Sequence, residues 1–238
     1  MRQFLITASL GLGLVLSACD DAPRRGEPYT PPSAAAQERE VLGETEPSDL
    51  PLGQRAALVY AHAMTARALA KAGDEAASDE ASIIGLAGGS ADAGLMTGLD
   101  TLGFDPAKLE AAMAAPDDET AAAAADEMLG GLRQGAAVDA KATIEFLMKS
   151  LSASYETAVV SGEIEDQSAY RGAYGLAVAA RDIAAAQDPE TFGSLKTELD
   201  VLVLMWPNKG PVYGALPAPE MVMAEQLARV KSELAGVP

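Results

Sequence analysis

The stretch between Lys141 and Gln187 contains two apolar stripes at helical spacing, and this feature constrains the fold most. On the first arm, apolar side chains recur every three or four residues, which places them on one face of a helix. They are Ile144, Leu147, Leu151, Tyr155 and Val159. The second stripe consists of Tyr170, Tyr174, Ala177, Val178 and Ile183. Because the joint between the arms is short, the two helices must pack back on each other. The stretch therefore predicts a helical hairpin.

Helix boundaries are marked by aspartate and glycine. Asp105-Pro106 and Asp188-Pro189 each combine a capping aspartate with a proline that suits the first helical turn. In the hairpin, Gly162 is expected to end the first helix in a left-handed conformation and Asp166 to cap the second. Long alternating runs of Val, Ile and Thr are missing, so no sheet is expected. The sequence predicts an all-α fold, a single bundle of about seven to eight helices over residues 53–238.

The first 18 residues predict a secretory signal peptide. Arg2 precedes an apolar run from Phe4 to Leu16 that is shorter than the roughly 20 residues needed to span a bilayer. The run ends in Leu16-Ser17-Ala18-Cys19, which resembles the lipobox of bacterial lipoproteins, whose cysteine is lipidated and becomes the new N-terminus. Cys19 is the only cysteine, so an internal disulfide is excluded. We expect Cys19 to carry a lipid that holds the protein on a membrane.

Residues 19–52 predict a disordered tether between this lipid and the bundle. Six prolines stand among acidic side chains, and few apolar residues are present to offset the entropy of ordering. Asp20 follows the cysteine, and in the enterobacterial sorting pattern that this resembles, aspartate there favours retention at the inner membrane. The expected location is the bacterial cell envelope, facing the periplasm, with a leaning towards the inner membrane.

The formal charge of −18 limits the classes of partner. Nucleic acid is not expected, because phosphate binding needs clustered Lys and Arg. Binding of cations or of a basic protein face remains open, and the alternative interpretation of the acidity is solubility alone. His62 is the only histidine and lies on a mostly apolar helical face, which favours a half-buried core position over a metal ligand. No nucleophile partner or cofactor motif accompanies His62, so the protein is not expected to be an enzyme.

The hairpin carries a resemblance to a known family. Tyr155-x-x-Ala158-Val159-x-x-Gly162-Glu163-Ile164-x-Asp166-x-x-x-Tyr170 resembles a pattern in the extracytoplasmic helical region of bacterial high-affinity iron permeases. Trp206-Pro207 and the final helix are also similar to the end of that region. Glu156 stands where the family usually has proline, and permeation is not implied because the family's membrane helices have no counterpart here. The resemblance implies an accessory or sensor-like domain that works near iron uptake at the cell surface. A membrane transporter or another envelope protein is the expected partner.

Two kinds of site follow from the hairpin joint. Glu163, Glu165 and Asp166 offer carboxylate oxygens suited to iron or another hard cation. The alternative is a solvated cluster that caps the helix. Tyr155 and Tyr170 flank the joint and, with Trp206, are expected to serve packing or partner contact. The predicted function is a non-enzymatic binding lipoprotein linked to iron uptake, and the alternative is a structural or assembly lipoprotein of the envelope with no role for metal.

Overall fold

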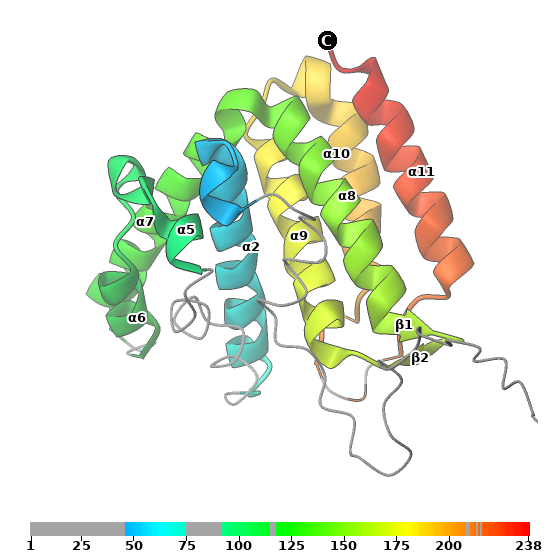
Figure 1. Cartoon of the computed structure of the whole chain (residues 1–238), viewed down its shortest axis with the longest axis horizontal. Coiled ribbons are helices and arrows are strands. Elements are labelled where there is room, and N and C mark those ends of the chain that lie inside the picture. Colours follow the sequence, from blue (N-terminus) through cyan, green and yellow to red (C-terminus); the bar gives the residue numbers. More distant parts are fainter. Residues whose placement is uncertain (1–45, 75–91, 115–117, 208–209, 213, 215) are drawn as a thin grey trace, which may run out of the picture. The chain divides into compact units, whose positions relative to one another are not determined.

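The computed structural model describes residues 46–74, 92–114, 118–207, 210–212, 214 and 216–238 (Figure 1). Contacts divide the chain into two units, residues 1–31 and 32–238, and every described residue belongs to the second unit. The predicted signal peptide, the lipidation site Cys19 and the predicted tether up to residue 45 lie outside the described residues.

The described part is almost entirely helical, which confirms the predicted all-α bundle. The α-helices are α2 (Leu52–Lys71), α5 (Asp92–Met96), α6 (Pro106–Ala114), α7 (Glu119–Ala136), α8 (Ala140–Ala158), α9 (Gln167–Ala185), α10 (Pro189–Val203) and α11 (Glu220–Gly236). Short 3-10 turns are η1 (Pro47–Asp49), η2 (Leu99–Leu102) and η3 (Ala137–Asp139). The expected arms of the central hairpin are α8 and α9.

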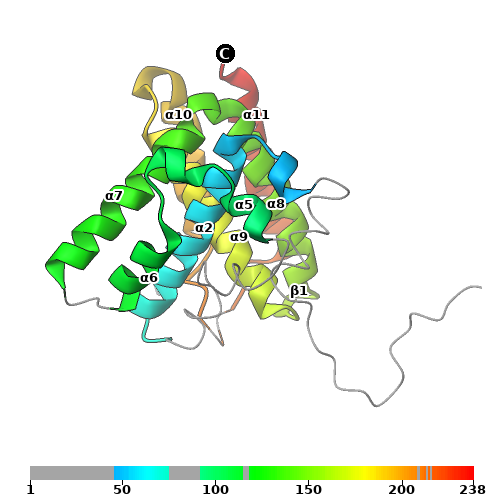
Figure 2. The same ribbon diagram turned by 60° about the vertical axis from the view of Figure 1, so that its left-hand side comes forward.

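Helix α9 lies at the centre of the packing. It packs against α8, α2 and α10, and α11 covers α10 and α8 (Figure 1). On the other side, α7 packs on α2 and α6 packs on α7 (Figure 2). The stripe of α8 faces inward, since Ile144, Leu147 and Leu151 are fully buried. This arrangement follows from the apolar stripes, because each helix must bury its stripe against a neighbour.

Aspartate side chains begin the helices where the sequence predicts. The Asp105 carboxylate accepts hydrogen bonds from two N–H groups at the start of α6. Asp166 and Asp188 each accept a hydrogen bond from a backbone N–H at the start of α9 and α10. The Thr191 hydroxyl bonded to Asp188 holds the pKa of that carboxyl below its usual value. These contacts join residues two or three positions apart, so local sequence is sufficient to specify them.

The prediction that the hairpin joint contains no sheet is wrong. Val159–Val160 (β1) pairs with Glu163–Ile164 (β2) in an antiparallel ladder after α8 ends. Between the strands, Ser161 and Gly162 have φ of 56° and 80°. Two consecutive left-handed residues form the type of turn that matches the twist of a two-residue β-hairpin. Val159 therefore belongs to a strand and Gly162 to a β-turn, although both were expected to belong to the first helix and its end.

The packed region begins earlier than predicted. Pro47 in η1 is buried, and Leu50 is 7% exposed and belongs to the main hydrophobic core. The predicted tether boundary at residue 52 is therefore several residues too late, because the prolines there lead into a packed turn. Across the described ranges, no helix is long and apolar enough to cross a membrane.

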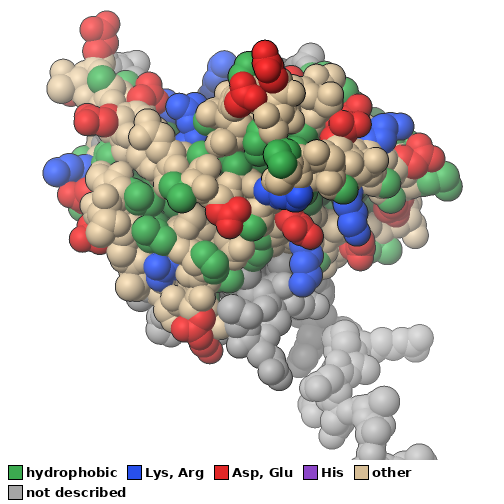
Figure 3. Space-filling view, turned by 90° about the horizontal axis from the view of Figure 1, so that it is seen from above, with side chains coloured by type: hydrophobic (Ala, Val, Ile, Leu, Met, Phe, Trp, Pro, Cys, Tyr) green, Lys and Arg blue, Asp and Glu red, His purple; other side chains and the backbone are tan. Residues whose placement is uncertain are grey.

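Both signs of charge are interspersed on the face seen from above. Acidic and basic side chains alternate there with hydrophobic ones, and neither sign forms a continuous field on that face (Figure 3). This pattern is typical of a solvated protein surface.

Candidate functional site

Four helix termini meet at one end of the bundle, beside the two-stranded ladder. Helix α8 ends there and α9 begins there, and α10 ends close to the start of α11. The Gly162 N–H donates to Glu220 Oε1 at 3.2 Å, which ties the β-turn to the start of α11. The Tyr155 hydroxyl donates to the Ala218 carbonyl at 2.6 Å, just before α11. We call this region the hairpin end.

The hairpin end is built around four aromatic side chains, which we call the aromatic cluster: Tyr155, Tyr170, Tyr174 and Trp206. The Trp206 ring centroid lies 5.9 Å from that of each tyrosine, and the Tyr155 and Tyr170 centroids are 6.1 Å apart. The Tyr155 and Trp206 rings are nearly perpendicular, at 85°. These distances and tilted or edge-to-face geometries are those that aromatic pairs prefer. The structure thus brings together the three aromatic residues that sequence analysis singled out and adds Tyr174.

Only some polar atoms of the aromatic cluster have a hydrogen-bond partner. Tyr170 is 0% exposed and Trp206 is 3% exposed. The Tyr170 hydroxyl and the Trp206 Nε1 are buried without a hydrogen-bond partner in the described part of the chain. Burial raises the pKa of Tyr170 to about 12, and it also raises the pKa of Tyr155. The phenols are therefore neutral at physiological pH, and the cluster supports packing rather than proton transfer.

Two matched substitutions separate these hydroxyls. Tyr155→Phe should lower the free energy of unfolding by about 1 kcal/mol, because the Ala218 carbonyl loses its donor. Tyr170→Phe should leave it unchanged or raise it by up to about 1 kcal/mol, because the lost hydroxyl has no partner. Urea unfolding of the full chain followed by circular dichroism measures both. Equal losses in the two variants would show that the Tyr170 hydroxyl is bonded in solution.

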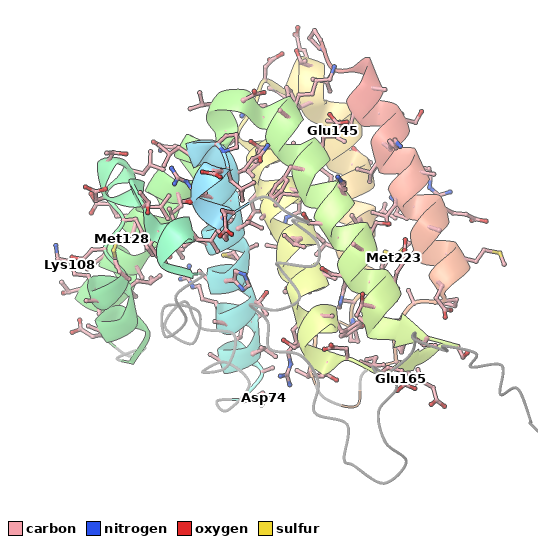
Figure 4. The ribbon with its side chains drawn as sticks, in the orientation of Figure 1. Asp74, Lys108, Met128, Glu145, Glu165 and Met223 are labelled. Atoms are coloured by element: carbon pink, nitrogen blue, oxygen red, sulfur yellow. The ribbon has the colours of Figure 1, made fainter. Side chains whose placement is uncertain are left out.

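The three acids of the joint do not form one cluster of ligands. Glu163 and Glu165 are exposed, whereas Asp166 is 2% exposed and caps α9 through the N–H of Ala169 at 2.9 Å. Asp166 was predicted as a metal ligand, but one of its carboxylate oxygens accepts this capping hydrogen bond. Glu165 lies at the outer edge of the hairpin end (Figure 4). Among the described residues, no three His, Cys, Asp or Glu side chains are arranged to hold a metal ion.

Large apolar side chains are exposed at the hairpin end. We call the following set the apolar patch: Val160, Val201, Leu204, Leu216, Met221 and Val222. Leu204 is 72% exposed and Met221 is 75% exposed. Because α10 ends and α11 begins at the hairpin end, the two helices run antiparallel (Figure 1). The Gln226 side chain donates to the Glu198 carbonyl at 2.7 Å, so Val201 and Val222 lie at about the same level one turn nearer the hairpin end. Several large exposed apolar side chains near the same end of a bundle indicate a contact surface.

The acidic rim completes the hairpin end. We give this name to Glu163, Glu165 and Glu220, three exposed carboxylates on or beside the ladder and at the start of α11. Hydrogen bonds from backbone N–H groups, including that of Gly162, lower the pKa of Glu220. A surface of this kind suits a partner that presents apolar side chains flanked by Lys or Arg. Sequence analysis missed the apolar patch, because residues 160, 204 and 221 come from three different segments.

His62, which sequence analysis predicted as a half-buried core residue, lies on α2. It is half-buried there, in agreement with that prediction. The β-turn that sequence analysis missed did leave a sequence pattern. Ser161-Gly162 follows two β-branched residues, and such a dipeptide between β-formers is typical of a hairpin turn.

The chain was compared with known proteins at the levels of family, sequence and structure. No protein-family model matches it, and it has no significant match among curated proteins or solved structures.

Proposed function

We propose that this protein is a lipid-anchored, non-enzymatic binding domain of the bacterial cell envelope that faces the periplasm. The observation that carries the proposal is the sequence Leu16-Ser17-Ala18-Cys19 at the end of a short apolar segment. An acylated Cys19 would hold the bundle at a membrane, and the 27 or so residues up to the first described one would allow it to reach a neighbouring membrane protein.

The hairpin end supports a docking role for the bundle. Its apolar patch and acidic rim form a surface whose burial against a partner would be favourable. We propose an integral membrane protein as the partner, because the lipid would confine the domain to the membrane surface and raise the local concentration of such proteins. The resemblance around Tyr155 and Tyr170 favours a transporter of iron, with Glu163 and Glu165 as exposed candidate contacts for a cation.

Lipidation is tested by substituting Cys19. In the native host, wild-type protein should fractionate with membranes and carry an N-terminal peptide whose mass includes acyl chains. Cys19→Ser should lose the acyl mass and leave the membrane fraction. If the wild-type protein matures without an acylated cysteine, the anchor is ruled out.

Docking is tested by site-specific photo-crosslinking in living cells. A crosslinker at Leu204 or Met221 should form an adduct with one integral membrane protein. When the crosslinker is at Leu204 and the chain also carries Met221→Glu, the yield of that adduct should fall at least tenfold. Val138 is the matched control, because it is 88% exposed and lies just before α8, far along that helix from the hairpin end. Equal adducts from all three positions would contradict a specific surface.

The link to iron is tested separately. Titration calorimetry of the full chain with ferrous and ferric iron should show binding that Glu163→Gln with Glu165→Gln weakens. No heat of binding, together with a defect in envelope integrity on deletion of the gene, would favour the alternative of a structural lipoprotein that uses the same anchor.

A further inference from the structure

A second surface feature lies between α8 and α11, outside the aromatic cluster and the apolar patch. The two helices lie side by side (Figure 1). Their side chains line a groove of about 630 Å³. The floor of the groove is apolar: it includes Met148, Leu227 and Leu234, together with alanines of both helices. Its walls carry charged side chains from α8 and α11.

The relative direction of α8 and α11 places two lysines opposite each other. The Lys141 ammonium donates to the Val237 carbonyl at one end of the groove, and Tyr155 contacts Ala218 at the other. The helices are therefore antiparallel. Lys149 lies about midway along α8, and counting residues from these two end contacts places Lys231 of α11 between about 3 and 10 Å from its level along the axis. Both lysines line the groove, one from each wall.

The charge around the groove contrasts with that of the whole protein. Three lysines and two glutamates line it, whereas the chain as a whole carries a formal charge of −18. Glu156 accepts a hydrogen bond from Ser152 at 3.0 Å, and Glu145 is exposed on α8 (Figure 4). In the described part of the chain, neither Lys149 nor Lys231 forms an ion pair. Two ammonium groups above an apolar floor suit an anionic head attached to an apolar chain.

The size of the groove distinguishes between an acidic helix and a small anionic lipid as its occupant. A helix of 10–12 Å diameter lying along the groove for about 20 Å would fill roughly 2,000 Å³. The observed 630 Å³ is much smaller and lies in the range of about 300–1,000 Å³ typical of small-ligand sites. From Lys141 to Glu156 the groove follows α8 for about 22 Å, and about 12 Å of it lies between Lys149 and the Lys141 end, which suits an extended aliphatic chain of medium length.

We propose that the groove between α8 and α11 binds a medium-chain fatty acid such as laurate, with its carboxylate between Lys149 and Lys231 and its chain along the apolar floor. This proposal is independent of docking at the hairpin end, because the residues of the two surfaces do not overlap. It gives the bundle a ligand class that is available wherever membrane lipids are turned over.

Calorimetry of the full chain with laurate, below its micelle concentration, tests the charge requirement. Laurate should bind at least tenfold more tightly than dodecyltrimethylammonium, which has the same chain length and the opposite charge. The double variant Lys149→Gln, Lys231→Gln should weaken laurate binding at least tenfold. Lys108→Gln is the control and should leave binding unchanged, because Lys108 lies on α6, away from α8 and α11 (Figure 4).

Photo-crosslinking locates the ligand independently of these variants. A diazirine-bearing fatty acid should label peptides of α8 or α11, and excess laurate should suppress the labelling. Labelling confined to residues 1–18 or to the hairpin end would overturn the proposal. So would the absence of laurate binding, or equal binding by the double variant and the wild-type chain. Binding of an acidic helical peptide at the groove without any binding of laurate would also overturn it.

Discussion

Replacing Trp206 with alanine is expected to lower the free energy of unfolding by about 3–5 kcal/mol, the range for a buried aromatic side chain. The Trp206 side chain is 3% exposed and contacts three tyrosines from α8 and α9. Removing the indole leaves a cavity among these tyrosines, so the loss includes both burial and ring contacts.

Guanidinium unfolding of the full chain, followed by circular dichroism, measures this effect. Leu204→Ala is the control, because Leu204 follows α10 two residues before Trp206 and is 72% exposed. We expect that variant to stay within about 0.5 kcal/mol of wild type. A Trp206→Ala variant that loses less than about 1 kcal/mol would show that the aromatic cluster does not hold the hairpin end together.

Gly175→Ala is expected to lower the free energy of unfolding by about 1–3 kcal/mol, because the backbone of α2 lies close against α9 at this glycine. A Cβ atom at residue 175 would overlap the Ala61 carbonyl oxygen and the Thr65 hydroxyl, and would lie 3.0 Å from the Ala61 carbonyl carbon. The Thr65 hydroxyl also donates to Ala61 O at 3.1 Å and Arg171 O at 3.3 Å. The backbones must therefore separate to admit a methyl group.

Gly172→Ala is the matched control for this prediction. Gly172 lies one turn earlier in α9, and no atom lies within 4 Å of a Cβ built there. Alanine has the higher helix propensity, so this variant should gain about 0.5–1 kcal/mol. Thermal and urea unfolding of both variants measure the difference. The close contact between α2 and α9 would be contradicted if Gly175→Ala were as stable as Gly172→Ala.

The two glycines show where prediction from sequence reaches its limit. Gly172 and Gly175 occupy the same helix and have the same intrinsic propensity, and only one faces a neighbouring backbone. The helical hairpin itself was predicted correctly from its apolar stripes. Its joint was predicted as a helix end, because the pattern of Val159 continued the stripe of α8, whereas the two-residue turn favours a β-ladder.

The candidate site was predicted in part. Tyr155, Tyr170 and Trp206 were singled out, and the structure places them in one cluster. Glu163, Glu165 and Asp166 are adjacent in sequence, but the capping role of Asp166 buries its carboxylate while the other two face solvent. Closeness in sequence therefore did not predict whether the three carboxylates meet at one site, because neighbouring side chains at a turn point in different directions.

The sequence alone determined the helices and their capped starts, because these depend on a repeat of 3.6 residues and on hydrogen bonds that span two or three positions. The tertiary structure decided which faces approach each other. The contact of Trp206 with Tyr155 and the groove between α8 and α11 join segments separated by 40 or more residues along the chain. Their closeness results from how the helices pack together, which no local pattern specifies.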